Sequence, residues 1–490
     1  MALTSFFIAL AILCIEGWLL AGIFMPGSDR WLRITFALPL AAISNVLLFF
    51  TYTVIGVPLA LVSLGIGHAI MIISLTLMQR VMVRGPAVMV RDGARNARIP
   101  HHDTAGPSRI HTRCMRLLCM LLLVNIFIFS FAHALLLHTF SIDSLTNWTM
   151  RSKISFVDRS MAFDPNENRG MSKPQYPFLT HALQIAANQG QREWNDRAAN
   201  AITWLLSLSC FSAVFLLLKR LRGTDSALLT LTLIAGIPLL SIHLAQGYGD
   251  IHLVEYLLLA LCMVAVHIES EAKPRRSLID GAGSAIFVLG GMWTKSEGLF
   301  FGFAPWALIL LLFMMLQKKK TFAPVVMIVT TFALFAPFLL LLRSKGLPFT
   351  PHETDAAFAW HPEGLAALWP SLFGVGSFGI MWYVLPIASV LCIIEWQKKS
   401  KSIDPRFLPL LLWGWLIVVE NLFIYLFTPN VGFLLNGESF FRQMLPAAAL
   451  IILACAFVLL PQPRRAAAEK KIPKQHPSLG AVDDASPRTS

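Results

Sequence analysis

Charged residues are scarce in this chain of 490 residues. Only 14% of the residues are Asp, Glu, Lys or Arg, whereas a soluble domain carries about a quarter. Hydrophobic residues make up 56% of the chain, and several apolar runs approach or exceed the roughly 18–20 residues that a helix needs to cross a bilayer. Because backbone groups in lipid must be hydrogen-bonded within their own segment, we expect an all-α polytopic membrane protein.

Paired cysteines and metal-binding spacings are also missing. The seven cysteines lie in or beside apolar runs, which excludes disulfide staples in the polar loops, and no Cys-x-x-Cys pair predicts a metal site. A net charge of +13 can indicate a nucleic-acid partner. Here, however, the basic residues occupy short segments between apolar runs, as orientation signals do. We therefore expect the lipid bilayer, and no nucleic acid, as a partner.

Thirteen apolar segments are candidate spans, which predicts a bundle of about 13 transmembrane helices. They cover residues 5–24, 33–54, 57–79, 116–139, 199–218, 226–245, 251–268, 278–293, 299–316, 322–343, 377–395, 406–427 and 442–460. The first lacks a basic start and a small-residue cleavage site, so we expect it to be retained.

With these spans, the basic segments all fall on one side of the membrane. They are 80–115, 219–222, 273–276, 318–320, 398–401 and the tail after 461. The positive-inside rule makes this side cytoplasmic, which puts the N-terminus outside and the C-terminus inside. The loops at about 140–197, 344–376 and 428–441 then share the outer face.

Four regions follow from this division. Residues 1–79 form a three-span N-terminal unit, and 80–115 form a basic cytoplasmic linker. Residues 116–461 form the main transmembrane module with its long external loop, and 462–490 read as a disordered cytoplasmic tail.

The first external loop opens with a carboxylate followed by an aromatic ring and cations: Asp143, Trp148, Arg151 and Lys153. Asp143 is either a solvated helix end or a general base beside a lipid-borne substrate. Trp148 is either an interface anchor or a ring that packs on a sugar face. The cations either face water and lipid headgroups or stabilise a phosphate leaving group.

A Tyr-Pro turn follows in the same loop. Pro177 restricts Tyr176 to extended geometry and is suited to the start of a helix. We expect a structured turn that opens an interfacial helix over about 178–189. The turn either folds the loop back over the bundle or only packs there.

Three further polar sites lie between later spans on the outer side. Asp250 lies in Gln-Gly-Tyr-Gly-Asp and either marks a tight turn or serves the site. Lys295 and Glu297 interrupt an apolar region and form either a local ion pair or a phosphate site. Arg442 opens the last span from the outer side, where its planar fork suits phosphate unless it merely snorkels to the interface.

The order of these motifs resembles bacterial GT-C glycosyltransferases, relatives of the protein mannosyltransferases and aminoarabinose transferases. The resemblance spans roughly 116–460 and rests on the loop-opening Asp, the Tyr-Pro turn, GYGD, KSEG and the late Arg before Leu-Pro. It implies a GT-C-like bundle and a polyprenyl-phosphate-sugar donor. It also implies Asp143 as the catalytic residue, Trp148 as an aromatic sugar or interface contact, and the following substrate- or phosphate-binding residues: Lys153, Tyr176, Asp250, Lys295, Glu297 and Arg442.

The chain departs from the family pattern at three places. It has KSEG where the family usually has KNEG, Arg442 follows two Phe rather than a Ser-Asp pair, and no acidic pair surrounds Asp143. The last departure leaves the need for a divalent metal open. His243 and His252 flank Asp250 without clear ligand spacing. No other cofactor is implied.

The sequence therefore predicts a glycosyltransferase of the bacterial inner membrane. It moves a hexose or pentose, with inversion, from a polyprenyl-phosphate carrier to an unidentified envelope acceptor (a lipid, glycan or protein) on the extracytoplasmic face. The alternatives are a polysaccharide polymerase or ligase, a lipid or sugar transporter such as a flippase, and a non-catalytic assembly factor.

Overall fold

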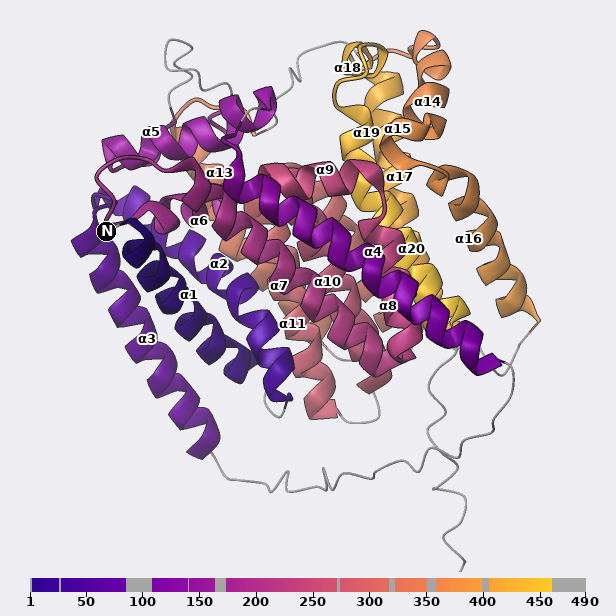
Figure 1. Ribbon diagram of the computed structural model, residues 1–490, viewed down its shortest axis with the longest axis horizontal. Helices are drawn as coiled ribbons and strands as arrows, with labels where there is room; N and C mark the ends of the chain where they lie inside the picture. Colours follow the sequence, from indigo (N-terminus) through magenta and orange to yellow (C-terminus); the bar gives the residue numbers. More distant parts are fainter. Residues whose placement is uncertain are drawn as a thin grey trace, which may run out of the picture.

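Long apolar helices make up most of the fold, as the hydrophobic runs predict. A computed structural model describes residues 2–25, 28–84, 108–139, 141–163, 173–270, 274–316, 322–349, 358–398 and 405–460, and these contain no strand. The helices that follow the predicted spans are α1 (Ala2–Phe24), α2 (Arg30–Ile55), α3 (Leu61–Arg84), α4 (Ser108–Leu136), α7 (Asp196–Arg222), α8 (Thr224–Ala235), α9 (Pro238–Gln246), α10 (Gly249–Ser270), α11 (Pro274–Thr294), α12 (Ala304–Leu316), α13 (Ala323–Ser344), α16 (Met381–Gln397), α17 (Pro409–Phe427) and α20 (Leu445–Leu459) (Figure 1).

Short helices connect them. They are the π-helical turns η1 (Ser144–Thr149) and η3 (Gly298–Phe303), the 3-10 turn η4 (Pro405–Phe407), and α5 (Met150–Asp158), α6 (Leu179–Asn188), α14 (Glu363–Phe373), α15 (Val375–Phe378), α18 (Val431–Leu435) and α19 (Phe440–Gln443).

The chain is a multi-pass membrane protein. By length and composition, the described residues contain 10 helices able to cross a membrane, or 11 if the bent pair α8 and α9 is one span. The segment Gly281–Thr294 of α11 and the whole of α16 are apolar but shorter. These elements occupy the positions of all the predicted segments. The count of thirteen spans stays a prediction, because ten helices, or eleven with the bent pair, meet the length and composition of a full span within the described residues.

The segment predicted as one span over 226–245 is bent. Its two parts, α8 and α9, meet at an angle of 77°. Pro238 is the first residue of α9 and has no N–H to continue the hydrogen bonding of α8, so the helix breaks before it. The break turns α9 toward the Gly-Tyr-Gly-Asp segment that follows.

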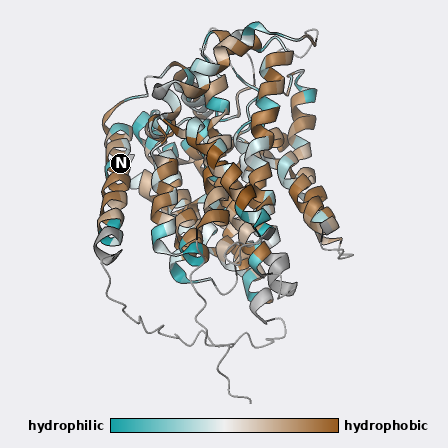
Figure 2. Ribbon diagram, turned by 90° about the vertical axis from the view of Figure 1, so that its right-hand side faces the viewer, coloured by the Kyte–Doolittle hydropathy of each residue, from teal (hydrophilic) through white to brown (hydrophobic). Residues whose placement is uncertain are grey.

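Helix α10 lies at the centre of the bundle. Of the residues in its apolar span, 94% are buried, and the helix packs against α7, α11 and α20. Apolar residues cover the helices along their length, and polar ones gather toward the two ends (Figure 2).

Helix α2 belongs to the same core. Tyr256 of α10 donates a hydrogen bond to the carbonyl oxygen of Pro39 at 2.8 Å, and the Phe36 and Phe287 rings stack with centroids 5.3 Å apart. α2 also packs against α6 and α7. The second helix of the expected N-terminal three-span unit therefore packs against helices of the main module, and the division of the chain into these regions stays a prediction. The linker and the tail lie largely outside the described residues.

The polar loops predicted to share one face have their described helices at one end of the bundle, where α5, α14, α18 and α19 lie (Figure 1). Helix α6 begins where the Tyr-Pro turn predicts, but the expectation that it is interfacial is wrong. All its residues are buried, because it packs between α2, α5 and α7. Helix α14 has the interfacial character instead, with Leu365 and Trp369 exposed.

The contact between α16 and α20 gives a test of the fold. The thiols of Cys392 in α16 and Cys455 in α20 lie next to each other across this contact. We expect a membrane-permeable copper–phenanthroline oxidant to join them in native membranes, detected by mass spectrometry of the linked peptides. Buried Cys119, Cys210 and Cys262 provide the internal control and stay reduced. A Cys392 that pairs with none or with another cysteine would contradict this packing.

Candidate active site

Five charged side chains from four chain segments meet at the end of the bundle that carries α5 and α19 (Figure 1). We call them the charged cluster, and they are Asp143 before η1, Asp250 in α10, Lys295 and Glu297 between α11 and η3, and Arg442 in α19. All five are site residues expected from the sequence. Asp143 and Arg442 lie 299 positions apart in the chain, so the cluster depends on the tertiary fold.

Two cations are shared among three carboxylates. Arg442 Nη1 donates a hydrogen bond to Asp143 Oδ2 and lies 3.8 Å from Asp250 Oδ2. Lys295 Nζ donates to Asp250 Oδ1 at 2.8 Å and lies 3.0 Å from Glu297 Oε1. Asp250 therefore contacts both cations and is the centre of the cluster.

Burial divides the cluster into an inner and an outer part. The side chains of Lys295 and Asp250 are 6% and 4% exposed, and Glu297 is 13% exposed. Asp143 and Arg442 are 26% and 20% exposed. A ligand approaching from outside the bundle thus meets Asp143 and Arg442 first.

The charges of the cluster do not leave a free cation. Burial disfavours the charged form of Lys295, but Asp250 and Glu297 raise its pKa above the ordinary value, so it stays protonated at neutral pH. With its carboxylates ionised, the cluster has one more negative than positive charge. An anionic ligand must therefore take the place of a carboxylate on one of the cations.

Two amides extend the cluster and were not predicted. Asn147 Nδ2 donates to Asp143 Oδ1, and Gln443 Nε2 donates to Glu297 Oε1 at 3.3 Å. Both residues are uncharged, so the charge pattern does not single them out. Their signal is spacing, because Asn147 follows Asp143 by one helical turn and Gln443 is adjacent to Arg442.

Tyr248 of the Gly-Tyr-Gly-Asp segment lies against the outer part. Its ring centroid is 6.0 Å from Arg442 Cζ, and its hydroxyl is hydrogen-bonded to Ser141 Oγ. The His243 ring stacks on the Tyr248 ring, with the two centroids 4.3 Å apart. Burial raises the pKa of the Tyr248 phenol, so it remains a neutral hydrogen-bonding group beside the guanidinium.

Tyr176 joins the inner part through its ring. The centroid lies 5.9 Å from Lys295 Nζ, and the ring stacks on Trp148 at 5.0 Å with an angle of 6°. Trp148 also stacks on His181 at 5.5 Å and is 1% exposed. Trp148 is therefore enclosed in the structure and stacks on Tyr176 from the buried side.

The two glycines of the Gly-Tyr-Gly-Asp segment are required for different structural reasons. Gly247 ends α9 with φ +64°, a backbone conformation that favours glycine. Gly249 permits a close approach, since a Cβ there would lie 2.3 Å from Cη2 of the Trp148 ring. The segment can therefore place Asp250 beside Lys295 only without a side chain at position 249.

The two cations expected near Asp143 do not join the cluster. Arg151 is buried, and its guanidinium donates to the carbonyl oxygens of Ala162 and Tyr176. Burial lowers the pKa of Arg151 to about 9, which leaves it charged at neutral pH, and it anchors the Tyr-Pro turn. Lys153 is exposed on α5 and forms no ion pair with another described residue.

Within the described residues, no three His, Cys, Asp or Glu side chains group as metal ligands would. His252, one of the two histidines near Asp250, is instead hydrogen-bonded to Glu255 at 2.9 Å. Asp250 itself is directed at the two cations. The described arrangement is thus a network of ion pairs.

Comparison with protein-family models, curated proteins and solved structures found no significant match. The charged cluster and its position in the bundle are therefore the basis on which a function is inferred.

The close contact of Gly249 with Trp148 predicts a specific defect. Gly249→Ala should lower the free energy of unfolding by about 1–3 kcal/mol, as overpacking does, and displace Asp250. Thermal unfolding in detergent measures the effect. Gly432→Ala is the control, because a Cβ there meets nothing within 4 Å. Trp148→Phe should partly restore the Gly249→Ala protein; an unaffected single variant would contradict the packing.

The burial gradient predicts that the cluster residues differ in their contribution to stability. Lys295→Met leaves Asp250 and Glu297 without their shared cation, and breaking a buried ion pair costs about 3–5 kcal/mol. Asp143→Asn changes a more exposed group and should unfold near the wild-type temperature. Equal unfolding temperatures for wild type and Lys295→Met would show that the inner part does not stabilise the fold.

Proposed function

We propose that this protein is a membrane glycosyltransferase that moves a sugar from a polyprenyl-phosphate carrier to an envelope acceptor. The observation that carries the proposal is the outer pair of Asp143 and Arg442. It joins a partly exposed carboxylate to a guanidinium at the end of an apolar bundle. A lipid-borne sugar phosphate needs a base for the acceptor, a cation for the phosphate, and a site within reach of the bilayer.

The reaction divides these roles between the two side chains. The acceptor hydroxyl attacks the anomeric carbon while the bond from that carbon to the phosphate oxygen breaks on the opposite face, which inverts the configuration. Asp143 accepts the hydroxyl proton. Arg442 stabilises the charge that develops on the departing polyprenyl phosphate, for which a bidentate guanidinium is suited.

The ion pair between Asp143 and Arg442 determines how the donor phosphate binds in this proposal. Arg442 is held by Asp143 and Asp250, so the donor phosphate binds by replacing Asp143 on the guanidinium. That exchange frees the Asp143 carboxylate to accept a proton only when the donor is present. Asn147, which donates to the other carboxylate oxygen, keeps Asp143 in place after the exchange.

The inner residues have a supporting role in this proposal. Lys295 is already shared between two carboxylates, so we assign it to fixing Asp250 and Glu297 rather than to contacting the phosphate. Asp250 in turn orients Arg442 from the buried side. Tyr176 closes the site next to Lys295.

We place the reaction on the extracytoplasmic face of a bacterial inner membrane. The support is the sequence distribution of Lys and Arg, which marks the opposite end of the bundle as cytoplasmic. On this basis the N-terminus is outside and the C-terminus is cytoplasmic.

The pairing of two ionisable residues within the spans also favours an enzyme over a transporter. A transporter needs a polar pathway near the bilayer midplane. Glu16 of α1 is instead paired with His68 of α3 at 2.7 Å, and Glu255 is paired with His252 on the same helix. The charged cluster lies at the end of the bundle.

Asp143→Asn should lower the transfer rate about 10²–10⁴-fold, as loss of a general base does. Deletion cells would carry the wild type, Asp143→Asn or the control Glu438→Gln, which alters an exposed carboxylate near α19, at matched membrane levels. Mass spectrometry would compare their envelope glycans and polyprenyl-linked sugars. We expect Asp143→Asn to match the deletion, with one sugar missing from an acceptor and its donor accumulating. A wild-type profile would rule out Asp143 as the base.

A further inference from the structure

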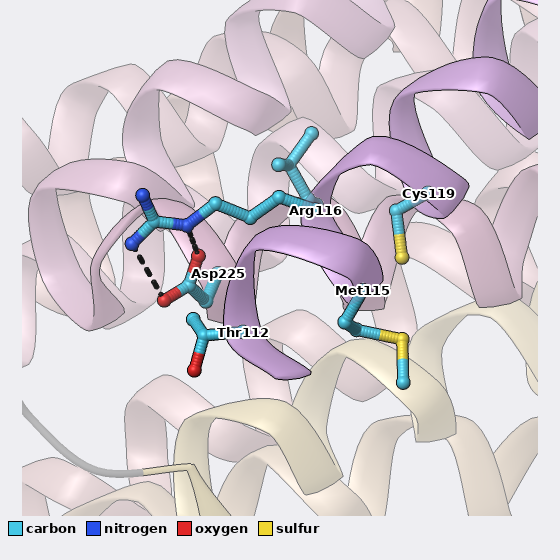
Figure 3. A pocket seen from close by; sticks show the side chains of 6 residues that line it. Thr112, Met115, Arg116, Cys119 and Asp225 are labelled. Atoms are coloured by element: carbon cyan, nitrogen blue, oxygen red, sulfur yellow. Dashed lines mark hydrogen bonds and ion pairs between the residues drawn. The ribbon is translucent and has the colours of Figure 1, made fainter. Parts of the chain in front are cut away.

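A hollow lies beside the N-terminal part of α4, at the opposite end of this helix from the segment that leads to Asp143. It has a volume of about 360 Å³ and lies between α4 and α8. Its lining residues are Thr112, Met115, Arg116 and Cys119 from α4, and Asp225 and Leu228 from α8 (Figure 3). The candidate active site uses none of these residues.

The sequence of α4 explains why the helices do not close against each other here. Positions 112, 115, 116 and 119 lie on one face of the helix, at the spacing of one and two turns. Thr112 and Cys119 are small, so this face is shallow. The larger neighbours Leu117, Leu118 and Leu121 are exposed instead, at 55%, 52% and 58%. The hollow thus opens on the apolar, exposed surface of α4 and α8.

An ion pair lies at the rim of this hollow. Arg116 Nη2 donates to Asp225 Oδ2 at 2.9 Å, and Nε donates to the other oxygen (Figure 3). The side chains are 47% and 48% exposed. Exposed pairs of this kind contribute little to stability, so another anion can exchange with Asp225 on the guanidinium fork at small cost.

The surrounding charge favours such an anion. Arg113 is exposed one turn before Arg116, and Lys219 and Arg220 are exposed at the end of α7, just before α8 begins. Arg222 is different, because it is buried and donates to the carbonyl oxygen of Phe457. Among the described residues, the exposed side chains of Arg113 and Lys219 therefore add positive charge near the Arg116–Asp225 pair.

We propose that this hollow binds an anionic glycerophospholipid. The phosphate lies on Arg116 in place of Asp225, with Arg113 and Lys219 nearby, and an acyl chain enters the apolar space beside Met115 and Leu228. Basic pockets between transmembrane helices bind anionic headgroups in this way. Because Thr112 is the first residue of the candidate span in α4, the proposal places the rim at headgroup depth and the floor at acyl-chain depth.

The proposal predicts opposite changes in phospholipid affinity for variants of Asp225 and Arg116. The carboxylate occupies the fork when no lipid is bound, so Asp225→Asn should strengthen phospholipid binding. Arg116→Gln should weaken it about fivefold, the effect of one basic side chain at a membrane surface. Cys119→Leu fills the apolar floor without changing charge and should also weaken it.

The experiment is native mass spectrometry of the full chain in detergent, titrated with phosphatidylglycerol or with phosphatidylcholine of the same acyl chains. We expect retention of phosphatidylglycerol only, and opposite shifts for Asp225→Asn and Arg116→Gln. The matched control is the exposed pair of Lys398 and Glu395 at the end of α16, where Lys398→Gln and Glu395→Gln should change nothing.

Three results would overturn the proposal. Equal retention of the two lipids would show that charge does not select the ligand. Shifts of the same sign for the Arg116 and Asp225 variants would show that they act only on the fold. Binding of glycerol phosphate as tight as that of the lipid would identify a free-phosphate site, because the apolar floor would then contribute nothing.

Discussion

The sharing of two cations among three carboxylates is the interaction on which the candidate site depends. It joins segments that lie up to 299 positions apart and holds Asp143 and Arg442 at the accessible edge. In an apolar bundle the inner charges are tolerable only because each has a partner. The same arrangement means that a ligand phosphate binds by exchange with a carboxylate, which couples donor binding to the release of the proposed base.

The surrounding structure serves this arrangement. Gly249 allows the chain to pass the Trp148 ring and deliver Asp250 to Lys295. Arg151 fixes the Tyr-Pro turn through the Tyr176 carbonyl, and Tyr176 covers Lys295. The described part of this polar loop is therefore packed into the core through α6.

Length and composition were sufficient to predict the helices, because the backbone of an apolar run in lipid has to form its hydrogen bonds within the run itself. The order of the motifs, and the position of ionisable residues beside apolar runs on the predicted outer side, singled out Asp143, Asp250, Lys295, Glu297 and Arg442. They could not show which charges pair, because pairing depends on the packing of distant helices. The burial of Trp148 and α6 was missed for the same reason. The α8–α9 bend had a local signal in Pro238 that the run of apolar residues obscured.

The most direct test of the account is a cryo-electron microscopy structure of the full chain with a polyprenyl phosphate bound. The account predicts the phosphate on Arg442, with Asp143 released from the guanidinium and still held by Asn147, and the contacts of Lys295 with Asp250 and Glu297 unchanged. A phosphate bound elsewhere, with the ion pair of Asp143 and Arg442 intact, would contradict it.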